Sequence, residues 1–107
     1  MSLTLSDGSD AELAALALAG RQDAYRELLA RHRESVFRLV RAATGDPHEA
    51  LDLTQETFVA AFAALRSYDR ERPFAVWVKR IALNKCRDWA RRRRVRAFFT
   101  RAVPLED

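Results

Sequence analysis

The sequence predicts an all-α fold: a compact helical bundle of about four helices with a long basic C-terminal helix. Three observations support this prediction. The chain of 107 residues contains only three glycines and three prolines, so few positions interrupt a helix. Alanine, leucine, arginine and glutamate are abundant while β-branched residues are few, a composition that favours helix. Apolar residues also recur every three or four positions along most of the chain.

The N-terminal half shows clear helix boundaries. Residues 1–8 are expected to form a flexible leader. The capping-box pattern Ser9-Asp10-Ala11-Glu12 then predicts a short helix to about residue 19, which Gly20 ends. A second helix is expected over about residues 23–43, with Gly45 as its stop.

The strongest local signal is the sequence Asp46-Pro47-His48-Glu49. Asp46 can cap a helix, Pro47 suits the first helical position, and Glu49 completes the capping pattern. A third helix is therefore expected to about residue 65. Its buried stripe should consist of Ala50, Leu53, Thr57, Phe58, Ala61, Phe62 and Leu65.

A polar loop is expected over residues 66–73, and Pro73 should open the fourth helix. The apolar side of that helix should comprise Phe74, Trp77, Val78, Ile81, Ala82 and Trp89. Lys85 interrupts this stripe, which predicts that the helix leaves the bundle near that residue. Beyond Arg96, residues 97–107 are expected to form a linker.

The charge of the chain is unevenly distributed. Residues 1–78 carry nine basic and twelve acidic side chains, a net charge of −3, whereas residues 79–101 carry ten basic and one acidic, a net charge of +9. Glu106 and Asp107 bring the total to +4. A weakly acidic body with a basic C-terminal segment indicates a polyanionic partner on one side of the molecule.

A row of polar residues lies within the basic segment. Arg80, Asn84, Arg87, Arg91 and Arg94 follow one another at spacings of 4, 3, 4 and 3, so they share one face of a helix. Such a row can follow a phosphate backbone. The amide of Asn84 carries both a donor and an acceptor and can therefore read a base edge. The alternative is a solvated basic helix end that the helix dipole favours.

Aromatic and acidic residues offer two further candidate surfaces. Trp77 and Trp89 could stack on bases, although Trp77 also fits a core position. Tyr68 and Phe74 flank the polar loop and could pack against an unstacked base; alternatively, Phe74 closes the end of the bundle. The exposed polar triplet Asp52, Gln55 and Glu56 can receive a basic partner surface, or it is a solvated helix face.

Several other functions find no support in the sequence. No nucleophile, glycine-rich phosphate loop or third ligand accompanies the carboxylates, and His32, His48 and Cys86 lack metal-ligand spacing. No enzyme activity, cofactor or metal is therefore expected. A single cysteine forms no internal disulfide and fits a reducing, cytoplasmic location. No apolar run is long enough for membrane insertion.

Two segments resemble a known family. "DPHEALDLTQETFVAAFAAL" and "RPFAVWVKRIALNKCRDWARRRR" are similar to the second conserved region of bacterial sigma factors, in particular the extracytoplasmic-function (ECF) group. The resemblance covers roughly residues 9–96, and Leu51 departs from a commonly acidic position. The matching positions are Asp52-Leu53-Thr54-Gln55-Glu56-Thr57-Phe58, then Phe74, Trp77, Ile81-Ala82, Asn84, Asp88 and Arg91-Arg92.

The resemblance implies a transcription-initiation domain with two surfaces. Asp52, Leu53, Gln55 and Glu56 should dock on the clamp coiled coil of the β′ subunit of core RNA polymerase. The loop and fourth helix should hold the non-template strand of the promoter −10 element as single-stranded DNA, with one base flipped into a pocket near the loop. The DNA-binding residues would be Ser67, Tyr68, Phe74, Trp77, Lys79, Arg80, Asn84, Arg87, Arg91 and Arg94.

The resemblance also implies an anti-sigma protein as a partner, and a C-terminal region 4 domain, absent here, after the linker. The alternative to this whole assignment is a helical interaction module whose basic end binds RNA or an acidic protein. Base preference distinguishes the two, because generic polyanion binding depends on salt without preferring a sequence.

Overall fold

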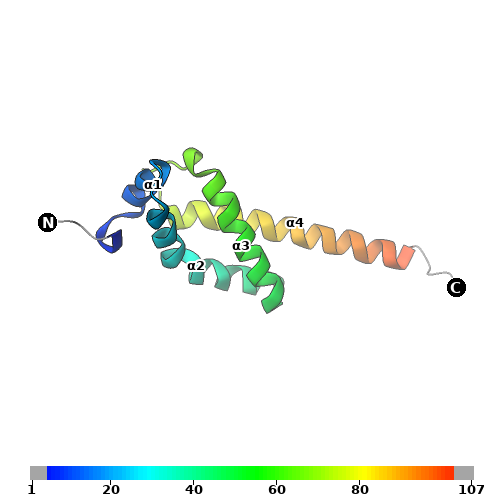
Figure 1. Ribbon diagram of the computed structural model, residues 1–107. Coiled ribbons are helices and arrows are strands. Elements are labelled where there is room, and N and C mark those ends of the chain that lie inside the picture. The colour runs from blue at the N-terminus through cyan, green and yellow to red at the C-terminus, as the bar shows by residue number, and fades with distance from the viewer. Residues whose placement is uncertain (1–4, 103–107) are drawn as a thin grey trace.

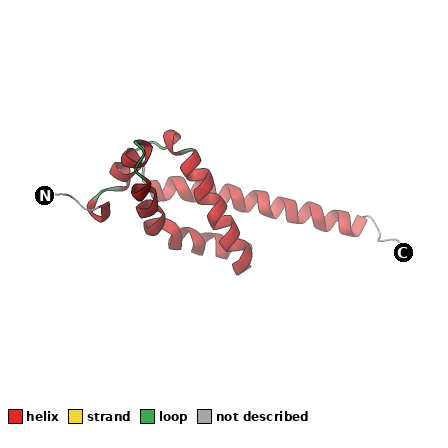
Figure 2. Ribbon diagram, in the orientation of Figure 1, coloured by secondary structure: helices red, strands yellow, loops and turns green. Residues whose placement is uncertain are grey.

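The structure, a computed structural model, describes residues 5–102. Four α-helices and two 3-10 turns follow one another along the chain (Figure 1). Residues 5–102 contain no strand, and only short loops separate the helices (Figure 2). The prediction of an all-α bundle is confirmed. In chain order, the elements are η1 (Leu5–Asp7), α1 (Asp10–Leu18), α2 (Gln22–Thr44), α3 (Pro47–Ala63), η2 (Leu65–Ser67) and α4 (Phe74–Ala102).

The starts of α1 and α3 follow the capping signals in the sequence. At α1 the box is reciprocal, since Ser9 Oγ accepts from the Glu12 amide and Glu12 Oε1 accepts from the Ser9 amide, both at 3.1 Å. These hydrogen bonds lower the pKa of the Glu12 carboxyl. At α3, Asp46 Oδ1 accepts from the amides of His48 at 2.9 Å and Glu49 at 3.4 Å. Both helix starts are therefore set by local sequence.

Gly45 ends α2 in the left-handed conformation. Its φ is 73°, and its amide donates to the Arg41 carbonyl at 2.9 Å. A residue with a Cβ is strained at this φ, so glycine suits the turn that leads directly into α3.

Removal of the Asp46 side chain tests the contribution of the α3 cap. Asp46→Ala should lower the free energy of unfolding by ~1 kcal/mol, because two amides of the first turn lose their acceptor. Asp52→Ala, an exposed change within the same helix, is the matched control. Urea denaturation measures both variants. Equal stability of the two variants would show that the cap contributes nothing.

The core lies where α2, α3 and α4 meet, and α1 closes one end. Most of the predicted α3 stripe is buried, and only Phe62 is half-buried. Thr54 was not predicted in this stripe but is buried as well; its hydroxyl donates to the Ala50 carbonyl at 2.6 Å, which removes the cost of burying it. The largest fully buried side chains are Phe74, Leu13, Leu28, Leu65, Val36, Val40, Val78 and Thr57.

The N-terminal segment differs from the predicted flexible leader. Residues 1–4 lie outside the described part of the chain. Leu5–Asp7 form a 3-10 turn, and Leu5 packs against the core. Arg31 of α2 donates to the carbonyls of Leu5 and Ser6 at 3.1 Å each, and to Asp10 Oδ1 at 3.2 Å. Tertiary contacts with α2 therefore hold this turn.

The fourth helix is longer than the sequence analysis predicted. It continues to Ala102, beyond the expected helix end at Arg96, since residues 97–102 contain neither glycine nor proline. The second half projects from the bundle, which makes the molecule 72 Å long but only 24 by 23 Å across (Figure 1). The last part of the predicted linker, residues 103–107, lies outside the described residues. Among the helices of residues 5–102, none is long and apolar enough to cross a bilayer.

Candidate protein and nucleic-acid interfaces

The polar triplet Asp52, Gln55 and Glu56 lies together on the surface of α3. All three residues are exposed and border a shallow hollow of about 510 Å³. Lys85 of α4 lies half-buried at the other side of this hollow. The predicted surface is thus an acidic helix face that a basic partner can reach.

Leu53 was predicted with this triplet among the polymerase-binding residues, and the structure corrects its placement. Only 2% of the residue is exposed, because it lies about 100° around α3 from Asp52, on the flank of the helix that packs into the core. The side chain cannot contact a partner at the triplet surface. Its contribution is to pack α3 against the bundle.

Apolar residues extend the α3 surface, and the sequence analysis did not identify them as an interface. Val59 is 71% exposed beside the triplet, and Leu51 is exposed one turn before Gln55. Two adjoining hollows of about 390 and 470 Å³ lie between α2 and α3, and both include Arg33 and Gln55. Together they form the α2–α3 groove. An apolar centre with a polar rim is the composition of protein-binding surfaces. The sequence feature that could have predicted this apolar area is the position of Leu51 and Val59 on the polar side of α3.

An aromatic cluster supports the loop between α3 and α4. The ring of Tyr68 lies 5.3 Å from that of Phe74 and 5.1 Å from that of Trp77, measured between centroids. The Tyr68 hydroxyl donates to the Arg72 carbonyl at 2.6 Å, which closes the loop over the cluster. Burial, together with the charges of Asp10 and Asp69, raises the pKa of Tyr68, so the phenol retains the proton that it donates.

A hollow of about 260 Å³ opens on the outer side of this cluster. It is bordered by the loop and by the first turns of α4. Its walls combine aromatic rings with polar and charged groups, as a site for an unstacked base requires. The lining residues are Ser67, Tyr68, Asp69, Arg72, Pro73, Val76, Trp77 and Arg80.

Phe74 was predicted to contact DNA, and the structure assigns it to the core instead. It is 1% exposed, and its ring lies against His32 at 4.9 Å and Trp77 at 5.5 Å. A base cannot stack on a ring that other side chains enclose. The alternative interpretation, that Phe74 closes the end of the bundle, is confirmed. Tyr68 and Trp77 both border the hollow. Tyr68 is only 7% exposed and mainly supports the hollow from the core side, whereas the half-buried Trp77 presents more of its ring to it.

Loss of the Tyr68 hydroxyl tests whether it holds this loop. Tyr68→Phe should lower the free energy of unfolding by about 1 kcal/mol, because the Arg72 carbonyl loses its donor. Tyr25→Phe is the control, since that ring packs edge-on against Phe62 away from the loop. Thermal unfolding compares the two variants. If Tyr68→Phe is as stable as the wild type, the hydroxyl does not hold the loop.

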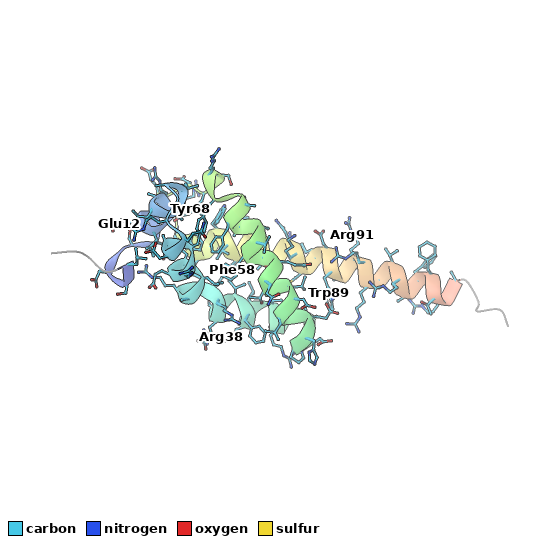
Figure 3. The ribbon with its side chains drawn as sticks, viewed as in Figure 1. Glu12, Arg38, Phe58, Tyr68, Trp89 and Arg91 are labelled. Carbon is cyan, nitrogen blue, oxygen red and sulfur yellow. The ribbon has the colours of Figure 1, made fainter. Side chains whose placement is uncertain are left out.

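The five residues of the α4 row are all exposed. Arg80 borders the loop hollow, and Asn84 follows one turn later. Arg87, Arg91 and Arg94 continue the row, and Arg91 lies where α4 extends past α3 (Figure 3). The row therefore runs from the hollow along the projecting part of the helix. Lys79 is half-buried and about 100° from Arg80 around the helix, so it lies beside the row rather than within it.

Arg92, Arg93 and Arg96 lie on another side of the basic segment, a separation that the sequence analysis did not describe. A hollow of about 270 Å³ brings Arg92, Arg93 and Arg96 close to Asp46 and Glu49 at the start of α3. The Arg93 guanidinium lies 5.4 Å from the centroid of the half-buried Trp89 ring. Trp89 is thus packed between the bundle and Arg93, which makes it a poor stacking site for a base.

Residues 5–102 hold no cluster of three or more histidine, cysteine or acidic side chains arranged to bind a metal. Cys86 is buried, and burial raises the pKa of its thiol. The three candidate interfaces are the α3 face, the loop hollow and the α4 row.

Comparison with known protein families assigns the chain to one of them. The family described as "Sigma-70 region 2" matches residues 28–96, and the chain belongs to that family. The resemblance to ECF sigma factors is confirmed by relatives of that group. "RNA polymerase sigma factor CnrH" of Cupriavidus metallidurans is 43% identical over 101 residues, which are 94% of this chain and 53% of that protein. "ECF RNA polymerase sigma factor SigW" of Bacillus subtilis is 33% identical, over 70% of this chain and 40% of that protein.

Two solved structures share the fold. One, with 28% identity and a TM-score of 0.74, is an engineered region 2 of sigmaE in complex with GTAAAA and covers 98% of this chain and 100% of its own. The other is CnrH in complex with the cytosolic domain of CnrY, with 43% identity, a TM-score of 0.68, and coverage of 74% of this chain and 51% of that one. This chain spans about half the length of the curated relatives it matches most extensively.

Proposed function

We propose that this chain directs RNA polymerase to promoters by docking on the enzyme and recognising the melted −10 element. It performs no catalysis and acts in the cytoplasm, where transcription takes place. The observation that carries the proposal is the exposed α4 row, which begins at the loop hollow. The hollow receives one unstacked base, and the row holds the strand that continues from it.

Within the row, the side chains divide the work by chemistry. The arginines neutralise phosphates, which supplies affinity without sequence information. Asn84 is the neutral member and lies one turn from the hollow, so its amide contacts the edge of a neighbouring base. The complex of an engineered sigmaE region 2 with GTAAAA supports a single strand as the ligand of this fold.

The α3 face is proposed as the docking site for the clamp coiled coil of the β′ subunit. Asp52 and Glu56 supply negative charge to a basic partner, while Gln55 lies between the triplet hollow and the α2–α3 groove. The exposed Val59 adds apolar area next to the charges. Charges at the rim set the orientation and rate of docking, and the apolar centre supplies affinity.

An anti-sigma protein is a further proposed partner. The support is the solved complex of CnrH with the cytosolic domain of CnrY. The length of the relatives likewise supports the proposal that residues 97–107 begin a connection to a region 4 domain in the full-length factor.

The proposal is tested by adding the chain to purified core RNA polymerase and following complex formation by gel filtration. We expect the chain to co-elute with the core enzyme, and the complex to retain a labelled −10 single strand at higher salt than a scrambled strand. If the chain elutes alone and binds RNA, DNA and acidic proteins without preference, it is a general polyanion-binding module instead.

A further inference from the structure

The α4 row continues beyond the residues assigned to DNA. After Arg94, the same spacing of four and three residues leads to Phe98 and Arg101, which are both helical and exposed. Phe98 lies 18 residues after Arg80, which is five full turns at 3.6 residues per turn. The phenylalanine therefore lies in line with the row, on the same face as Arg80.

Phe98 is 60% exposed although it is a large apolar side chain. Its ring meets that of Phe99 edge-on, with centroids 5.7 Å apart and planes at 81°. This single edge contact leaves most of the Phe98 ring open to solvent. Phe99 is similarly exposed, at 56%, but lies about 100° away around the helix. Two adjacent phenylalanines thus differ mainly in whether they lie on the row.

The surroundings of Phe98 are basic. No acidic residue follows Asp88 within α4, while Arg94 and Arg101 lie on the row on either side of Phe98. A second copy of this helix would bring like charges together, which disfavours self-association through this face. An aromatic ring between cations is the arrangement that holds single-stranded nucleic acid, because the ring stacks on a base and the cations neutralise its phosphates.

We propose that Phe98 is a stacking site for an unpaired base, which extends the strand-binding surface to the far end of α4. The inference rests on the proposed function, since it requires the strand to follow the row. Phe98 lies fourteen residues after Asn84, about 21 Å along the helix axis. That length equals about six nucleotides at a stacked rise of 3.4 Å. The site therefore contacts a base outside the segment that Asn84 reads, and it accepts any base.

The test measures affinity as a function of strand length. The chain on core RNA polymerase is titrated with a labelled six-nucleotide −10 strand. It is also titrated with two longer strands, which carry six additional unpaired nucleotides of arbitrary sequence at the 5′ end or at the 3′ end. We expect one extension to tighten binding by about tenfold. Phe98→Ala should remove most of that gain and leave the affinity for the six-nucleotide strand unchanged. Phe98→Trp should keep the gain, as should Phe99→Ala, the matched control.

The outcomes separate this inference from the proposed function. If even the six-nucleotide strand fails to bind, both the proposed function and the inference of a stacking site are wrong. If the short strand binds but Phe98→Ala keeps the full gain, only the stacking site is wrong. If Phe98→Ala and Phe99→Ala lose the extension's gain in affinity equally, the contact is a general apolar one and not stacking. The same conclusion follows if Phe98→Leu keeps the full gain. Such a surface would suit the apolar face of an acidic amphipathic helix instead. A gain of the same size when the extension is duplex would also overturn stacking, since paired bases are not available.

Discussion

Replacing Gln55 with alanine and Glu56 with arginine should weaken binding to core RNA polymerase by about 2–4 kcal/mol, or roughly 30- to 1,000-fold. Both residues are exposed on α3 and border the same hollow. The alanine removes an amide next to the α2–α3 groove. The arginine reverses a charge that should face a basic partner, so attraction becomes repulsion. The affinity is measured by titrating labelled chain with core enzyme.

The matched control carries the same kind of change elsewhere. Gln22→Ala with Asp23→Arg alters a neighbouring glutamine and acid on the first turn of α2. The free energy of unfolding of both double variants is measured first, so that a loss of binding is compared between folded proteins. An α3 variant that binds as tightly as the control would make the triplet a solvated helix face.

Replacing Asn84 with alanine should weaken binding to the preferred −10 strand by ~1–3 kcal/mol and should hardly change binding to a scrambled strand. The reason is that an amide discriminates between base edges, whereas a methyl group does not. The side chain is exposed, so its loss leaves the core intact. The measurement uses the factor on core enzyme with matched and scrambled single strands.

Arg91→Ala is the control on the same row. Its ion pair with Asp88 is exposed and long, at 3.7 Å, so its loss has little effect on stability. Binding to both strands should fall alike, and the salt slope should decrease by about one unit or slightly less. Equal losses on both strands for Asn84→Ala would instead make Asn84 part of an electrostatic surface.

Local signals in the sequence were sufficient for the helices and their order. The caps at Ser9 and Asp46 depend on groups within one turn of the chain. The reciprocal box formed as predicted at Ser9, whereas at Asp46 only the cap formed, because the Asp46 amide donates to Thr44 Oγ1 instead of to Glu49. The exposure of the α3 triplet and the α4 row follows from helical spacing alone. The helix caps and the exposed helix faces can be predicted without knowing which helices pack against each other.

Features that depend on packing between distant segments were not predictable in the same way. Phe74 has the residue type of a base-stacking side chain, yet contacts from α2 and the loop enclose it. The groove between α2 and α3 exists only once the two helices are side by side. The separation of the arginines into two sides likewise depends on where the start of α3 lies against α4.

The central claim is that this domain selects a single-stranded base sequence, and selection from a random pool tests it most directly. A pool of single strands with six randomised positions is bound to the factor assembled on core RNA polymerase, and the retained strands are sequenced. We predict one enriched motif for the wild type, and loss of preference at one of its positions for Asn84→Ala. Retention of the pool without enrichment, at any salt concentration, would contradict the claim and leave a surface that binds polyanions alone.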